Sequence, residues 1–123
     1  MLKKIYFYHH PAVADEGNRF ENLVALLLKK WCHSANERGL GSYELCYLRD
    51  QDRREVDFLL VNHNKPVLLI EAKKSDTSFT SASMFFANKL SLPILQIVAT
   101  PNIFASKKEG LVCSVARLAA VTG

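Results

Sequence analysis

The sequence contains no apolar run that approaches the roughly 18–20 residues of a membrane-spanning helix, so we expect no membrane partner. Its N-terminal segment, MLKKIYFYHH, is too short and too aromatic for a secretory signal peptide. Cysteine is scarce: Cys32, Cys46 and Cys113 are odd in number and lack the paired spacing of a zinc site. These absences argue against a secreted or membrane protein, and we expect buried free thiols in a reducing cytoplasm.

Internal repeats, low-complexity segments and linker-like stretches are also absent from the sequence. The 123 residues, of which 49% are hydrophobic, therefore predict a single domain, residues 1–123, with enough apolar material for one core. The formal net charge of +4 is mild, so it is compatible with a nucleic-acid partner without establishing one.

The hydrophobic pattern predicts two long helices and a series of strands. Apolar residues recur at helical spacing in Asn18–Trp31 and Ser78–Leu90. The expected strands are Lys3–Tyr8, Tyr43–Leu48, Glu55–Val61, Val67–Lys73 and Pro93–Val98, with a weaker one near Val112–Val115 and a closing helical turn. From the first helix onwards, the order of a helix, three strands, a helix and a strand argues for an α/β fold with a mixed central sheet flanked by helices.

Charged residues interrupt two of these apolar runs. Asp57 lies within Val56–Val61, and Glu71 ends the run that begins at Val67, with Lys73 two residues later. Strands that are apolar on both faces are usually buried, and an unpaired charge there is costly. Because residues two apart in a strand share a face, we expect Glu71 and Lys73 to point to the same side of the sheet.

The two strands also look joined as a hairpin, because the turn residues Asn62–Pro66 separate them. A tight loop centred on Asn64 would place Asp57 opposite Glu71, unless a bulge shifts the register. Opposed residues in a sheet have Cβ atoms about 4.5–5.5 Å apart, so the two carboxylates would repel each other unless they share a proton or a cation. A pair of oxygen ligands favours Mg²⁺ or Mn²⁺.

The order of these motifs resembles the restriction-endonuclease-like, or PD-(D/E)xK, nuclease superfamily: an acid on the first helix (Glu21), an acid on the second of three strands, and Glu-x-Lys on the third. The strings YFY, RFENLVA, ELCYLRD, REVDFLL and LLIEAKKSDTS resemble the C-terminal domain, catalogued as of unknown function, of a family of uncharacterised prokaryotic AAA-type ATPases. This resemblance runs from about Lys3 to Val98. Two features depart from it: His9 and His10 stand where the family usually has an aspartate, and no Gly-x4-Gly-Lys-Ser/Thr phosphate loop is present.

The superfamily resemblance implies a restriction-endonuclease-like αβββαβ core and a metal-dependent deoxyribonuclease. Asp57, Glu71 and the backbone carbonyl of Ala72 would hold Mg²⁺ or Mn²⁺ against the scissile phosphate, with Glu21 as a further ligand. Lys73 would orient the attacking water or stabilise the developing negative charge. The candidate catalytic residues are therefore Glu21, Asp57, Glu71 and Lys73.

Each candidate also has a structural interpretation. Glu21 in a first helical turn can complement the helix dipole at the surface, and Lys73 can pair with Glu71 or Asp57 across the sheet. Gln96, on an expected buried strand, either faces the site or satisfies a hydrogen bond in the core. Five basic residues form either a phosphate-contacting rim or a solvated face: Arg49, Arg53, Arg54, Lys65 and Lys74.

We therefore expect a Mg²⁺-dependent nuclease-like domain that hydrolyses DNA phosphodiester bonds. One alternative is a non-catalytic docking or oligomerisation module of an AAA ATPase family that retains the nuclease fold, and another is a nucleic-acid binder with a residual metal site. The expected partners are DNA, an AAA ATPase module and a second copy of the chain, as a homodimer.

Overall fold

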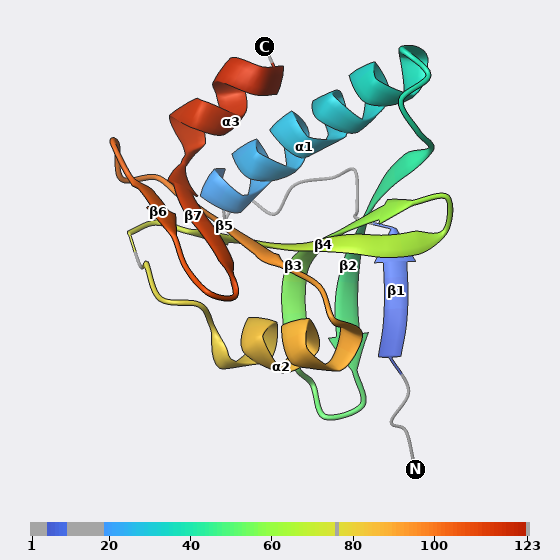
Figure 1. Ribbon diagram of the computed structural model, residues 1–123, viewed down its shortest axis with the longest axis vertical. Helices are drawn as coiled ribbons and strands as arrows, with labels where there is room; N and C mark the ends of the chain where they lie inside the picture. Colours follow the sequence, from blue (N-terminus) through green and yellow to red (C-terminus); the bar gives the residue numbers. More distant parts are fainter. Residues whose placement is uncertain (1–4, 10–18, 76, 123) are drawn as a thin grey trace.

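The computed structural model of the protein describes residues 5–9, 19–75 and 77–122. These residues form an α/β fold in which three helices flank one mixed sheet of seven strands (Figure 1). The elements follow the chain in the order β1 (Ile5–His9), α1 (Arg19–Glu37), β2 (Tyr43–Asp50), β3 (Glu55–Asn62), β4 (Lys65–Lys73), α2 (Ser81–Leu90), β5 (Ile94–Val98), β6 (Phe104–Ser106), β7 (Gly110–Ser114) and α3 (Val115–Thr122). From α1 to β5 the order is the predicted one of a helix, three strands, a helix and a strand.

The sheet has the strand order β1-β2-β3-β4-β5-β7-β6, and its two halves differ in strand direction. The strands β1 to β4 are antiparallel to their neighbours, whereas β4, β5 and β7 are parallel and the edge strand β6 is antiparallel to β7. Parallel strands need a crossover connection, which α2 supplies between β4 and β5. The strand β4, which carries Glu71 and Lys73, therefore lies where the antiparallel half meets the parallel half.

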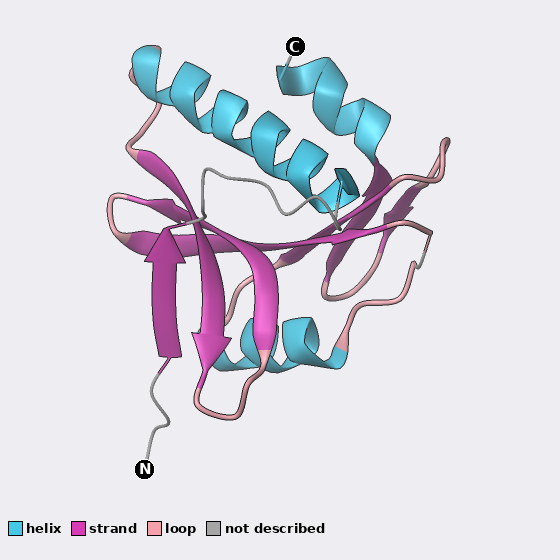
Figure 2. Ribbon diagram, turned by 180° about the vertical axis from the view of Figure 1, so that it is seen from behind, coloured by secondary structure: helices cyan, strands magenta, loops and turns pink. Residues whose placement is uncertain are grey.

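The helices form two layers, with α1 and α3 on one side of the sheet and α2 on the other (Figure 2). Val24 of α1 packs in one buried cluster with Phe58 of β3. Phe86 of α2 packs in a second cluster with Leu59, the next residue of β3. From Phe58 to Val61, successive residues of β3 therefore point into opposite layers, as the period of a strand requires.

The helix α1 is longer than the sequence predicts, because it ends at Glu37 and not at Trp31. Its apolar stripe continues to Ala35, which is fully buried. The helix stops where Gly39 adopts a left-handed φ of 74° and the Leu40 N–H donates to the Ala35 carbonyl at 3.0 Å.

Differences also occur at the two ends of the chain. The short edge strand β6 is not predicted by the pattern, and the strand expected at Val112–Val115 lies at Gly110–Ser114, directly before α3. The strand expected at Lys3–Tyr8 is found as β1, although positions 3 and 4, like position 18 of the expected first helix, lie outside the described residues.

The three cysteines are free and buried, as the sequence predicts. Burial is the main reason that the pKa of the Cys32 thiol is raised to about 11, so this thiol stays protonated at neutral pH. Within the described ranges, no helix combines the length and the apolar character that crossing a membrane would require.

Gly110→Ala is expected to destabilise the fold by about 3 kcal/mol or more, because β7 approaches β5 closely at this position. A Cβ atom on Gly110 would lie 1.8 Å from the backbone oxygen of Ile94, its partner in the ladder. Gly39→Ala is the matched control: its Cβ would meet nothing within 4 Å, so it adds only about 1–2 kcal/mol of left-handed strain. Urea unfolding measures both, and equal destabilisation would contradict the close approach.

Candidate active site

The candidate site lies where β3 and β4 separate. The last pair of their ladder is Phe58 with Ile70. Beyond this pair β3 continues alongside β2, and β4 continues alongside β5, so the two strands diverge (Figure 1). Asp57 and Glu71 are the first residues beyond the ladder, and we call this place the fork.

A bulge brings Asp57 and Glu71 opposite each other. The predicted loop centred on Asn64 is wrong, because the turn consists of His63 and Asn64, with φ of 49° and 64°, between the paired positions 62 and 65. Continued without a break, that register would place Asp57 opposite position 70. A register shift between the turn and the site corrects this by one residue, so Asp57 and Glu71 follow the last pair directly and lie next to each other, with the Asp57 N–H donating to Glu71 Oε2.

The Glu71 carboxylate points towards α2. Leu59 and Leu69 face each other and pack in the buried cluster beneath α2. Glu71 lies two residues from Leu69, so it projects to the side of Leu69. Asp57 lies at a bulge of β3 against β2, so its contacts with β4, and not the period of the strand, place its carboxylate. Lys73, two residues beyond Glu71 on the regular β4–β5 ladder, shares this side as predicted.

Glu71 is buried, with an exposed fraction of 3%, and its two oxygens have different surroundings. Its Oε1 accepts hydrogen bonds from the hydroxyls of Thr80 and Ser83, at 3.0 and 2.9 Å. Its Oε2 accepts a longer hydrogen bond, 3.4 Å, from the backbone nitrogen of Asp57. The Thr80 hydroxyl also accepts the Ser83 N–H at 3.1 Å as the N-cap of α2, so this helix begins at Ser81, later than predicted.

Asp57 is held at the fork by the backbone of β4. Its Oδ2 accepts a hydrogen bond from the Ala72 N–H at 3.0 Å. The N–H and C=O of one strand residue point to the same edge of the strand, and neighbouring residues alternate. Because the Lys73 carbonyl turns the other way and accepts the Ala99 N–H at 3.3 Å, the Ala72 carbonyl lies on the Asp57 side of β4.

The carboxyl group of Glu71 is strongly perturbed. The pKa of Glu71 is raised to about 8, first by burial and then by the hydrogen bond and negative charge of Asp57, while the hydroxyls of Ser83 and Thr80 lower it. Without a cation, Glu71 therefore holds a proton near neutral pH. Such perturbed acids are typical of functional sites, and a divalent cation would take the place of the proton.

Lys73 is half-buried on the same side of β4 as Glu71. In the part of the chain that the structure describes, no ion pair joins Lys73 to Asp57 or to Glu71. The alternative of a simple salt bridge across the sheet is therefore not realised. A role for the Lys73 amine beside a phosphate stays a prediction.

Glu21 belongs to the first turn of α1, and α1 and α2 lie on opposite sides of the sheet (Figure 2). Among the described residues, no group of three or more His, Cys, Asp and Glu side chains could hold a metal ion, so Glu21 does not join Asp57 and Glu71 in such a cluster. Its role as a further ligand stays a prediction. The oxygen donors gathered at the fork are those of Asp57, Glu71 and the Ala72 carbonyl.

The sequence does not identify Thr80 and Ser83 as neighbours of the site. Thr-x-x-Ser is recognisable as a helix start, but its contact with Glu71 depends on how α2 packs under the sheet. Gln96 is fully buried and faces Glu71 in the β4–β5 ladder, while its Nε2 donates to the Ser78 carbonyl at 2.9 Å. Both interpretations of Gln96 are therefore partly correct: it lies on the side of the site, and it makes a structural hydrogen bond.

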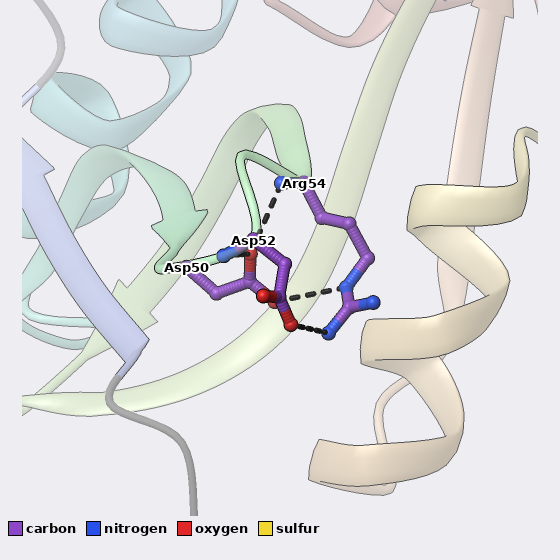
Figure 3. A network of polar contacts seen from close by, with 3 residues as sticks. All are labelled: Asp50, Asp52 and Arg54. Atoms are coloured by element: carbon purple, nitrogen blue, oxygen red, sulfur yellow. Dashed lines mark hydrogen bonds and ion pairs between the residues drawn. The ribbon is translucent and has the colours of Figure 1, made fainter.

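The turn that leads into Asp57 is fixed by a compact polar network (Figure 3). The buried Asp50 carboxylate accepts the backbone N–H groups of Asp52 and Arg54, both at 3.0 Å, and the Arg54 Nε at 2.8 Å. The guanidinium group of Arg54 also lies over the ring of Phe85 on α2, 3.6 Å from its centroid. Arg54 is therefore neither an open phosphate contact nor a solvated charge, but a link between the β2–β3 turn and α2.

Residues 16–115 of the chain match the family described as "Domain of unknown function (DUF4143)". The match includes the whole of the fork, from Asp57 to Lys73, and the hydroxyls of α2 that contact it. No curated protein and no solved structure matches the chain.

Proposed function

We propose that this chain, which belongs to the DUF4143 family of domains of unknown function, is a nuclease-like domain that uses Mg²⁺ or Mn²⁺ to hydrolyse DNA phosphodiester bonds. The observation that carries the proposal is the carboxyl pair at the fork. Asp57 lies beside the buried Glu71 carboxyl group, whose pKa is raised first by burial and then by the hydrogen bond to Asp57 and repulsion from its charge. A divalent cation would remove that repulsion.

The topology supports a restriction-endonuclease-like core. The segment from α1 to β5 has the order αβββαβ, and the two acids lie on its second and third strands. In this arrangement the two acids lie directly beyond the end of the β3–β4 ladder, where the two strands separate. Because one fold can serve several functions, the chemistry of the fork must carry the functional argument.

The donors at the fork fit a hard divalent cation. Mg²⁺ is commonly held by one or two carboxylates and completes its shell with water and phosphate oxygens. Asp57, Glu71 and the Ala72 carbonyl would hold it here. A cation so bound supplies charge neutralisation at the phosphate and a lowered pKa for a water molecule.

Lys73 is the proposed catalytic side chain that carries a positive charge, in addition to the metal ion. Its side chain projects from the side of β4 that carries Glu71, and it directly follows Ala72, whose backbone carbonyl is a proposed metal ligand. From there it would orient the attacking water or stabilise the charge that develops on the phosphate oxygens. It contributes no ligand to the metal, so its removal separates catalysis from metal binding.

The metal proposal predicts that Mn²⁺ raises the melting temperature of the wild-type protein at pH 7.5, because a ligand that binds only the folded state stabilises it. Asp57→Asn is expected to abolish this gain and to melt at or above the wild-type temperature in a chelator, because it relieves the repulsion on Glu71. Glu37→Gln, at the exposed end of α1, is the control that keeps the gain. A wild-type melting temperature that is independent of Mn²⁺ would count against the site.

Cleavage tests the proposed activity directly. Purified protein with Mn²⁺ is incubated with single-stranded, duplex and branched DNA, and Asp57→Asn is carried through the same purification. Nicking or degradation by the wild type alone supports the nuclease. Metal binding without cleavage of any of these substrates would favour the docking module.

One observation favours that second candidate, a non-catalytic docking module of an AAA ATPase. The carboxyl groups already have protein donors: two hydroxyls on Glu71 and the Ala72 N–H on Asp57. A protonated pair with these contacts is a stable buried feature without any metal. The Mn²⁺ melting experiment separates the two candidates, because only the first requires a cation.

A further inference from the structure

The strand pairing alone does not set the separation of Asp57 and Glu71. The β3–β4 ladder ends one residue before them, and the strands then follow different neighbours. At the fork the strands meet through side chains, as in the hydrogen bond from Ala72 to Asp57. Some other part of the fold must therefore hold the two strands in place relative to each other.

The helix α2 contacts β4 at Glu71. Two hydroxyls, those of the N-cap Thr80 and of Ser83 in the first turn of the helix, converge on the same oxygen, Oε1. Ser83 is fully buried, so its hydroxyl has no competing bulk water. With Oε1 held in this way, Oε2 is the oxygen directed to Asp57.

The same helix contacts the segment that leads into β3. The ring of Phe85 lies under the guanidinium group of Arg54, three residues before Asp57, and Arg54 is itself fixed by the buried Asp50 carboxylate. One short helix thus contacts β4 through hydroxyls and the segment before β3 through an aromatic ring.

Other parts of the fold hold the start of α2 in place. Gln96 Nε2 donates to the Ser78 carbonyl at 2.9 Å, and Lys107 Nζ donates to the Thr77 carbonyl at 2.6 Å. These contacts come from β5 and from the β6–β7 turn, so the segment before Thr80 is tied to the parallel half of the sheet. The hydroxyl of Thr80 is therefore presented to Glu71 from a defined position.

We infer that α2 is a brace that sets the spacing of the Asp57 and Glu71 carboxylates, with Ser83 and Thr80 as positioning residues. They hold Glu71 Oε1 and leave Oε2 for the cation shared with Asp57. The inference rests on the proposed function for the identity of that cation. Partners that orient a metal ligand typically change metal affinity about 10–100-fold when removed, because the free carboxylate must otherwise be ordered on binding.

The test uses Mn²⁺ alone as the probe, in calorimetric titrations of the full chain. Ser83→Ala, which deletes one hydroxyl, is expected to weaken Mn²⁺ binding by about 10-fold or more. Ser81→Ala, the same change at an exposed position of the same helix, is the control and keeps wild-type affinity. Thr80→Val should weaken binding as Ser83→Ala does, whereas Thr80→Ser, which keeps the hydroxyl, should not. Wild-type affinity in both Ser83→Ala and Thr80→Val overturns the brace.

A metal-free measurement separates this inference from the proposed function. In a double-mutant cycle followed by urea unfolding, Ser83→Ala and Glu71→Met are combined in the presence of a chelator. If the hydroxyl holds Glu71, the shift in unfolding midpoint of the double variant is smaller than the sum of the shifts of the two single variants. Additive shifts overturn the brace whether or not metal binds, while non-additive shifts in a wild type that binds no Mn²⁺ support the brace and contradict the metal site.

Discussion

Lys73→Ala is expected to lower Mn²⁺-dependent cleavage of DNA by about 10²–10³-fold while leaving the affinity for Mn²⁺ unchanged. The asymmetry follows from the places of the side chains. Asp57 and Glu71 face each other across the fork, whereas Lys73 lies one strand period further along β4. Initial cleavage rates and a calorimetric Mn²⁺ titration on the same preparations measure the two effects.

Lys108→Ala is the matched control for this experiment. Lys108 is an exposed lysine in the β6–β7 turn, so its loss changes the net charge equally without touching the fork. It should cleave like the wild type. Equal activity in the wild type and Lys73→Ala would instead identify a contaminating nuclease, and a parallel loss of Mn²⁺ binding in Lys73→Ala would refute the assigned division of roles.

The metal-free wild-type protein is expected to lose stability as the pH rises from about 4.5 to about 8, and Glu71→Gln is expected to abolish this loss. The pKa of Glu71 is raised on folding from its ordinary value of 4.5 to about 8, chiefly by burial and then by Asp57. The folded state therefore binds this proton more tightly than the unfolded state does. Its contribution to stability is complete below pH 4.5 and is lost as the pH rises through 8.

A tenfold difference in proton affinity corresponds to about 1.4 kcal/mol, so the loss of stability is on the order of a few kcal/mol. Urea unfolding in a chelator at pH 4.5, 6.5 and 8.5 measures it, with Glu55→Gln, an exposed acid of the same strand pair, as the control. Glu71→Gln should be the more stable protein at pH 8.5, because its neutral amide is not repelled by Asp57. Parallel pH profiles for the wild type and Glu71→Gln would rule out the raised pKa of Glu71.

The same pH experiment is repeated with Mn²⁺ in place of the chelator. At pH 8.5 the Glu71 carboxyl has lost its proton, so a cation at the fork should restore stability to the wild type and not to Glu71→Gln. A docking module with the same fold would show the pH-dependent loss without the restoration. The pH profile therefore reports on the carboxyl pair, and only the response to Mn²⁺ reports on the proposed activity.

Local patterns of the sequence determine the order of the elements and the two acids of the site. A charge inside an apolar strand is visible without a structure, because burial of an unpaired charge is costly wherever the strand packs. Asp57 and Glu71 stand out for that reason, and the period of a strand then places Lys73 on the side of Glu71. The free, buried state of the cysteines also follows from composition alone.

The tertiary structure decides how these residues meet and what surrounds them. The predicted single loop around Asn64 places Asp57 next to Glu71 for the wrong reason, because a two-residue turn and a bulge compensate each other. The hydroxyls on Glu71 come from 9 and 12 residues further along the chain, through the packing of α2 beneath the sheet. Contacts of this kind depend on where a helix docks, which no local propensity encodes. Only the tertiary structure therefore places the two hydroxyls on Glu71.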